Sequence, residues 1–241
     1  MEENNWWIAK ELVYLNLMSK IIIAIDGPAG SGKSTIAKMV AEKLKYTYLD
    51  TGAMYRAITY LALKKGVVDD EKAVNKLVEG LEVTLNFVDG VTHVFVDGNE
   101  LTEHIRTPEV NSKVSEIAAM SFVRKELVRM QQNMGKIGNV VAEGRDTTTV
   151  VFPDADLKIY LDASVEVRAF RRHKEYLEKG IEIDINEVAE NINKRDRIDS
   201  GREASPLQKA HNAIEVDSSN ISVEEEFEIL LENIKKKLNF D

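Results

Sequence analysis

A glycine-rich segment near the start of the chain limits the possible folds more than any other feature. Residues 27–35 read GPAGSGKST and fill every position of the pattern G-x-x-x-x-G-K-[ST]. An apolar run at 21–25 precedes the segment, and a helical pattern with Ile36, Val40 and Leu44 on one side follows it. A strand, a glycine-rich loop and a helix in this order bring several backbone N–H groups and a helix N-terminus to one anion. The sequence therefore predicts a nucleoside triphosphate site.

Within this segment, two side chains have distinct expected roles. Lys33 would reach the β- and γ-phosphates of ATP, and the Ser34 hydroxyl would ligate Mg²⁺. The whole segment is the expected donor-binding set, which consists of Gly27, Pro28, Ala29, Gly30, Ser31, Gly32, Lys33, Ser34 and Thr35.

The rest of the chain alternates short apolar runs with helical patterns. Strands are expected at 20–26, 46–49, 139–142, 157–161 and 213–216. Apolar strands that alternate with helices are typical of a parallel sheet with helices on both faces. We therefore expect an α/β fold of the P-loop NTPase type, with a doubly wound sheet of five parallel strands.

Two segments depart from this alternation. Residues 83–88 and 91–96 are β-rich and flank an Asp89-Gly90 turn, which predicts a small antiparallel insertion. Residues 194–202 read KRDRIDSGR and are followed by Pro206. We interpret this densely charged stretch as a mobile loop.

Composition limits the partners of the chain. A net charge of −9 argues against nucleic acid as a partner, because nucleic-acid-binding surfaces are basic. The absence of cysteine fits a cytoplasmic location, and no apolar run is long enough to span a membrane. Residues 1–17 are acidic at their start and precede Met18, a second possible start. We interpret residues 1–17 as an extension of uncertain role and residues 18–241 as the folded domain.

Arginines at expected strand ends and in the charged loop indicate the kind of acceptor. They are Arg56, Arg124, Arg145, Arg195 and Arg202. A phosphate acceptor is already ionised and needs no general base, but it needs cationic groups beside the triphosphate. This favours a nucleoside monophosphate kinase. A kinase of UMP or of a small metabolite remains an alternative, as does a nucleotide-binding regulatory ATPase module.

Further motifs resemble those of bacterial cytidylate kinases, in the same order and at similar spacing from about Met18 onward. They are DTGAMYR at 50–56, IRTPEV at 105–110, EGRD at 143–146, VFPDA at 151–155 and the charged segment from Arg195 to Leu207. The resemblance implies direct in-line transfer of the γ-phosphoryl group of ATP to CMP or dCMP, assisted by Mg²⁺. It also implies an acceptor-binding region at 66–125 and a lid at 195–206. We expect a monomer.

The resemblance also assigns individual residues. Those expected to act on the transferred group are Lys33, Arg145, Arg195 and Arg202, the last two from the lid. Those expected to bind the acceptor are Thr51, Tyr55, Arg56, Ser115, Arg124, Arg145, Asp146 and Asp199. In this assignment Arg56 and Arg145 hold the acceptor phosphate, and Asp199 binds the ribose hydroxyls. Thr51 stands where members of the family often carry serine, which leaves the choice between ribose and deoxyribose open.

The three residues assigned to the base suit cytosine. Asp146 could accept a hydrogen bond from the N4 amino group, while Arg124 and Ser115 donate to N3 or O2. Uracil would place O4 against the carboxylate, which disfavours it. The alternative role of Asp146 is a structural ion pair with Arg145 or Arg124.

Overall fold

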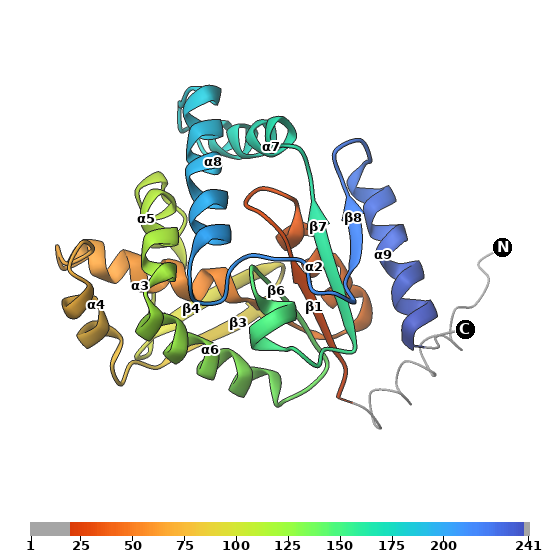
Figure 1. Ribbon diagram of the computed structural model, residues 1–241, viewed down its shortest axis with the longest axis horizontal. Helices are drawn as coiled ribbons and strands as arrows, with labels where there is room; N and C mark the ends of the chain where they lie inside the picture. The colour runs from red at the N-terminus through yellow and green to blue at the C-terminus, as the bar shows by residue number, and fades with distance from the viewer. Residues whose placement is uncertain (1–19, 239–241) are drawn as a thin grey trace.

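The main sheet places the phosphate-binding loop at the centre of the molecule. The computed structural model describes residues 20–238, so the extension expected at 1–17 lies outside the described residues. Over residues 20–238, five parallel strands lie in the order β2-β6-β1-β7-β8 (Figure 1). They are β1 (Ile22–Asp26), β2 (Thr47–Asp50), β6 (Val140–Gly144), β7 (Leu157–Asp162) and β8 (Ile214–Asp217). The α/β fold with a parallel sheet is confirmed.

Helices cover both faces of this sheet. On one face, α2 (Lys33–Leu44) and α9 (Val223–Leu238) pack against Ile23 and Ile25 of β1. On the other face, Ala24 packs near the π-helical turn η2 (Thr147–Val151). Helix α6 (Ser121–Gly135) extends this second layer. Successive side chains of a strand point to opposite faces, so β1 is buried on both and is apolar up to Asp26, its last residue.

Strand register brings distant motifs together. Asp26, the last residue of β1, lies opposite Gly144 of β6, and Asp50 of β2 lies opposite Glu143. The segments that follow β1, β2 and β6 therefore leave the sheet side by side at its carboxyl edge.

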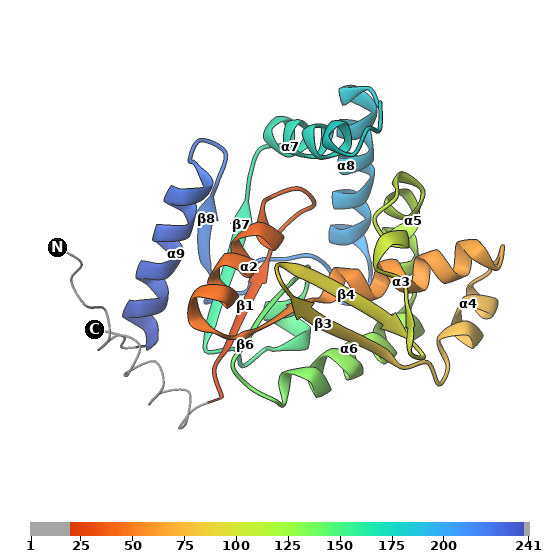
Figure 2. The same cartoon turned by 180° about the vertical axis from the view of Figure 1, so that it is seen from behind.

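A second unit is built on α3 (Thr51–Lys64) and has its own apolar core (Figure 2). Within the described residues, its antiparallel sheet contains β3 (Val83–Val88), β4 (Val91–Val96) and β5 (Asn99–Glu100). The predicted hairpin is confirmed, with Val88 paired to Val91 across the turn. Further elements of this unit are α4 (Glu71–Val78), the 3-10 turn η1 (Thr102–His104) and α5 (Pro108–Ala119). Helix α6 also packs Val123, Leu127 and Met130 into its core.

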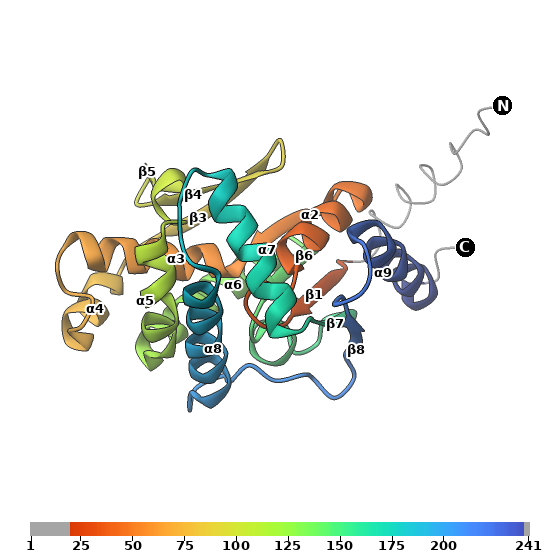
Figure 3. The same cartoon turned by 90° about the horizontal axis from the view of Figure 1, so that it is seen from above.

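Two helices lie over the carboxyl edge of the sheet, namely α7 (Val165–Glu178) and α8 (Ile185–Gly201) (Figures 1 and 3). The prediction of a mobile loop at 194–202 is wrong for most of that segment, because α8 continues to Gly201. Val188, Ile192, Arg195 and Asp199 are the buried residues of α8, spaced three or four apart. The high charge of the segment concealed this periodicity. No helix among residues 20–238 is long and apolar enough to cross a membrane.

Candidate active site

The residues expected to act on substrates meet in one cleft at the carboxyl edge of the sheet, where open α/β sheets bind ligands. The cleft is bordered by Lys33, Ser34, Thr51, Tyr55, Arg56, Ser115, Arg124, Arg145, Asp146, Arg195, Asp199 and Arg202. Of the other predicted donor-binding residues, Gly30, Gly32 and Thr35 also border it. Gly27, Pro28, Ala29 and Ser31 form the loop behind.

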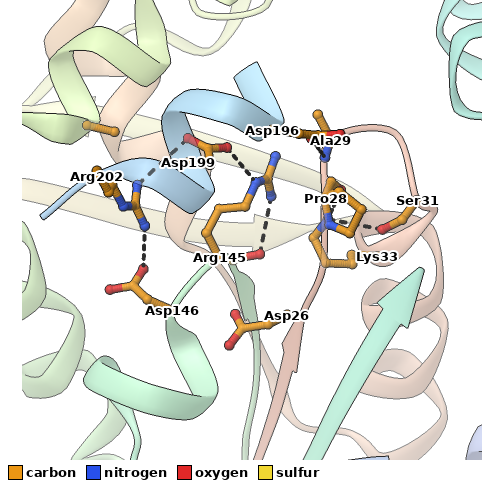
Figure 4. Close-up of polar contacts among 12 residues, drawn as sticks. Asp26, Pro28, Ala29, Ser31, Lys33, Arg145, Asp146, Asp196, Asp199 and Arg202 are labelled. Atoms are coloured by element: carbon orange, nitrogen blue, oxygen red, sulfur yellow. Dashed lines mark hydrogen bonds and ion pairs between the residues drawn. The ribbon is translucent and has the colours of Figure 1, made fainter. Parts of the chain in front are cut away.

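The conformation of the phosphate-binding loop depends on glycine. A Cβ on Gly27 would lie 1.9 Å from the carbonyl oxygen of Leu161, and Gly32 has a φ of 99°. Lys33 Nζ donates to Pro28 O at 2.7 Å and to Ser31 Oγ at 3.2 Å (Figure 4). Burial, with a contribution from Arg145, lowers the pKa of Lys33 to about 7. A bound triphosphate would favour the charged form of this lysine.

Two oxygen atoms suited to Mg²⁺ lie beside the loop. Ser34 Oγ donates to Glu143 Oε1 at 2.6 Å, and Tyr48 OH donates to the same oxygen at 3.2 Å. Hydroxyl and carboxylate oxygens are ligands that Mg²⁺ accepts, and the ion takes the remaining ones from phosphates and water. Ser34 and Glu143 therefore fit the metal that the sequence implies.

The middle of the cleft concentrates positive charge. Arg56, Arg145, Arg172 and Arg195 all border it. Burial and the nearby Arg145 lower the pKa of Arg195 to about 9, and burial and Arg106 lower that of Arg56 to about 10. Arg56 and Arg195 stay protonated at neutral pH, but burial and neighbouring arginines disfavour their charged forms. A bound anion would favour those charged forms. The middle of the cleft suits a phosphate group.

Arg145 connects this cationic region to α8. Its Nε donates to Asp199 Oδ2 at 3.1 Å, and the Asp199 side chain is 3% exposed (Figure 4). Burial opposes the charge of Arg145, but Asp199 and Glu143 raise its pKa above the usual value. Asp199 thus lies beside Arg145, one of the two arginines expected to hold the acceptor phosphate.

The far end of the cleft is buried and incompletely hydrogen-bonded. Arg124 forms an ion pair with Asp146, and Arg124 Nη1 donates to Ala118 O at 3.0 Å. Among the described residues, buried polar atoms without a partner include Tyr55 OH, Ser115 Oγ, Arg124 Nε and Arg202 Nη2. Such atoms are costly unless something hydrogen-bonds to them. This end therefore suits a flat, polar group such as a base.

Arg202 lies elsewhere than the sequence suggested. Its Nη2 is 3.7 Å from Asp146 Oδ1 and its Nη1 is 3.8 Å from Asp199 Oδ1 (Figure 4). It belongs to the far end of the cleft, whereas the expected place was over the transferred group near Lys33. Thr51 borders the cleft, and its hydroxyl donates to Glu143 O at 2.7 Å.

Sequence reasoning missed several residues that position the site. Asp26 accepts from Thr147 N, Thr148 N and Thr148 Oγ1 at 2.8, 2.7 and 2.6 Å, which fixes the turn after Asp146. The only sequence feature that could have indicated Asp26 is its position as a carboxylate at the end of a buried strand. Burial raises the pKa of Asp26, and the hydrogen bonds from Thr148 oppose that shift.

Two further contacts hold the helices over the sheet. Arg168 Nη1 donates to Ala29 O at 3.0 Å and to Asp196 Oδ2 at 2.7 Å, so α7 and α8 are tied to the phosphate-binding loop. Sequence analysis passed over Arg168 because a charge on a helix is usually solvated.

Asn111 connects α5 to the cationic region. Its Oδ1 accepts from Arg56 Nε at 3.4 Å, and its Nδ2 donates to Tyr176 OH of α7 at 3.3 Å. Asn111 and Tyr176 are both buried. No sequence signal distinguished either residue.

The family model and the similar proteins of known sequence agree on one family. The family model described as Cytidylate kinase matches residues 23–236. The chain is 47% identical to the cytidylate kinase of Bacillus subtilis (strain 168) over 219 residues, which cover 90% of this chain and 98% of the relative. It is 48% identical to that of Bacillus thuringiensis (strain Al Hakam) over 207 residues, covering 86% and 92%. A crystal structure of an uncharacterized protein from Eubacterium ventriosum ATCC 27560 shares the fold, with a TM-score of 0.51 at 13% identity and coverage of 90% and 99%.

Proposed function

The chain belongs to the cytidylate kinase family, and we propose that the cleft is where it transfers the γ-phosphoryl group of ATP to CMP or dCMP. It is an ATP-dependent phosphotransferase whose acceptor is a phosphate group. The observation that supports this use of the cleft best is the group of arginines that border it together with Lys33, of which Arg195 is buried and Arg56 and Arg145 are half-buried. Two polyanionic substrates can approach each other only where such charge is available.

On the donor side, the backbone N–H groups of residues 30–35 would hold the phosphates of ATP at the N-terminus of α2. Lys33 would leave its contact with Pro28 O and bind the β- and γ-phosphates. Ser34 and Glu143 would hold Mg²⁺, directly or through water. The bound ion would neutralise charge on the phosphates during transfer.

On the acceptor side, Arg56 and Arg145 would bind the phosphate of CMP, with Arg195 close by over the transferred group. The acceptor oxygen is ionised at neutral pH, so no base is required, and the reaction needs alignment of that oxygen with the γ-phosphorus. Asp199 would accept hydrogen bonds from the ribose hydroxyls. Arg202 would support Asp199 and Asp146 at the base end, given its two contacts there.

The base would lie against the Arg124–Asp146 ion pair. Asp146 would accept from the N4 amino group of cytosine, while Ser115 and Arg124 offer hydrogen-bond donors to N3 and O2. A site that binds its substrate through buried hydrogen bonds discriminates by up to ~10⁴-fold against an analogue that leaves those groups unpaired. The base-reading and ion-pair roles of Asp146 are compatible, because one carboxylate accepts several hydrogen bonds.

The proposal includes a monomer that acts in the cytoplasm, where ATP and CMP are available. The test is ADP release at fixed ATP and Mg²⁺, with CMP, dCMP, UMP, AMP or GMP offered separately. A strong preference for CMP or dCMP is expected. Equal rates with UMP would reduce the assignment to a pyrimidine monophosphate kinase, and ADP release that ignores every acceptor would overturn it.

A further inference from the structure

A buried carboxyl group of α9 faces the phosphate-binding loop and has no role in the site described above. Glu226 is 1% exposed, and its Oε1 is buried without a hydrogen-bond partner among the described residues. Its two carboxyl oxygens lie 3.7 and 3.8 Å from the position that a Cβ would take on Gly32. Glu226 also borders the cleft, together with Gly30, Lys33 and Thr35.

The neighbours of Glu226 show which part of ATP it would meet. The loop residues beside it are those whose N–H groups surround phosphates, so its partner is the triphosphate and not the base. A carboxylate next to a phosphate is repelled, whereas a carboxylic acid has an O–H that donates to a phosphate oxygen. The protonated form of Glu226 therefore suits a bound donor better than the carboxylate does.

The charged groups facing Glu226 are Arg171 of α7 and Lys33. Both already have other partners, since Arg171 donates to Ser31 O at 3.2 Å and to Ser218 O at 2.8 Å, and Lys33 donates to Pro28 O. Burial raises the pKa of Glu226 to about 7, and Arg171 and Lys33 only partly oppose this shift. The nearby charge of ATP would raise this pKa further.

We propose that Glu226 is a further donor-binding residue, whose carboxylic acid donates a hydrogen bond to a phosphate oxygen of ATP. Above neutral pH the side chain takes this proton from solvent when the donor binds. The inference rests on the proposed placement of ATP on the phosphate-binding loop.

The test compares the KM for ATP between pH 6.5 and 9 in the wild type, Glu226→Gln and Glu224→Gln. Glutamine is neutral, similar in size and has an N–H to donate. Glu224 is exposed on the same helical turn, so Glu224→Gln matches the change in net charge and should follow the wild type. Titration of ATP itself is common to all three proteins and cancels in the ratio of their KM values. Titration of Lys33, which faces Glu226, is common to the wild type and Glu224→Gln.

The wild-type KM for ATP should rise more steeply than that of Glu226→Gln, with their ratio increasing by up to about tenfold per pH unit above neutrality. Glu226→Met, which is neutral but has no donor, should have the flat profile of Glu226→Gln with a higher KM, and it provides a second variant if glutamine impairs folding. Parallel profiles in active enzymes would overturn this inference alone, because CMP-dependent ADP release would still support the proposed function. A wild-type KM below that of Glu226→Gln at pH 9 would also overturn it, since the carboxylate would then favour the binding of ATP.

Discussion

Arg124 of α6 and Asp146, which follows β6, form an ion pair whose side chains are only 3% and 6% exposed. Removing one member of such a buried pair typically destabilises a protein by about 3–5 kcal/mol, because the remaining charge is left without a partner. The pair nevertheless leaves Arg124 Nε without a protein partner among the described residues. The ion pair therefore presents a hydrogen-bond donor and an acceptor in a fixed arrangement, as recognition of a base requires.

The Asn111 contact predicts a selective effect on the acceptor. Tyr176→Phe removes the hydroxyl to which Asn111 donates, and Asn111→Ala removes the partner of Arg56 as well. We expect the KM for CMP to rise about 3-fold in the first variant, because one hydrogen bond is lost. It should rise about 10-fold in the second, because two are lost. The KM for ATP should stay within a factor of two. Equal increases in both KM values would show that these residues only support folding.

The contact between Glu143 and Ser34 predicts that Glu143 helps to bind Mg²⁺. Glu143→Gln keeps an oxygen that can accept from Ser34 but removes the negative charge next to Mg²⁺. We expect the Mg²⁺ concentration for half-maximal activity to rise by about 10-fold or more, as is typical when a metal's supporting ligands are changed. A titration with Mg²⁺ at saturating ATP and CMP measures this. An unchanged midpoint would remove Glu143 from the metal site.

The contacts of Asp26 predict a stability change. Thr148→Val removes one of the hydrogen bonds to this buried carboxylate and should lower the free energy of unfolding by about 1–3 kcal/mol. Thr149→Val, one position along the same turn, should cost less, because the Thr149 hydroxyl makes only a 3.4 Å contact with Asp146 O. Urea unfolding of both variants at pH 7 is the measurement, and equal losses would contradict this account of the turn.

The pKa of Glu226 predicts how stability depends on pH. Its folded pKa is raised to about 7 from a usual value of 4.5, so the folded state holds a proton that the unfolded state releases. Stability from this group therefore decreases as the pH rises through that window. The melting temperature of Glu226→Gln minus that of the wild type should be larger at pH 8 than at pH 5. Scanning calorimetry without ATP measures this difference. A difference that is independent of pH would refute the raised pKa.

Local patterns made much of the fold predictable. The phosphate-binding loop and the hairpin around Asp89-Gly90 depend on short-range backbone preferences, so their sequences specify them directly. The central strand β1 was recognisable because it is buried on both faces and apolar from Ile22 to Ile25. The other strands of the main sheet were recognisable as short apolar runs between helical patterns. The family resemblance supplied the residues of the acceptor site, and the structure brings those residues to one cleft.

Long-range contacts made the remainder unpredictable. The end of α8 reads as a loop until Arg195 and Asp199 are seen to be buried on one face, beside Arg145. Asp26 and Glu226 are inconspicuous in the sequence because the residues that bury them lie far away along the chain. Burial decides whether such a carboxyl group is a solvated charge or part of a site.

If Asp146 reads the base, the choice between CMP and UMP should depend on its carboxylate. The ratio of kcat/KM for CMP to kcat/KM for UMP, compared between wild type and Asp146→Asn, measures this. The wild type should prefer CMP by about 100-fold or more, as expected of a buried hydrogen-bonding site. Asparagine can present either its carbonyl or its amide to a base, so the ratio should fall by at least about tenfold, chiefly through lost CMP turnover, while the KM for ATP is unchanged. Full CMP turnover with an unchanged ratio would contradict the account and leave Asp146 as the structural partner of Arg124.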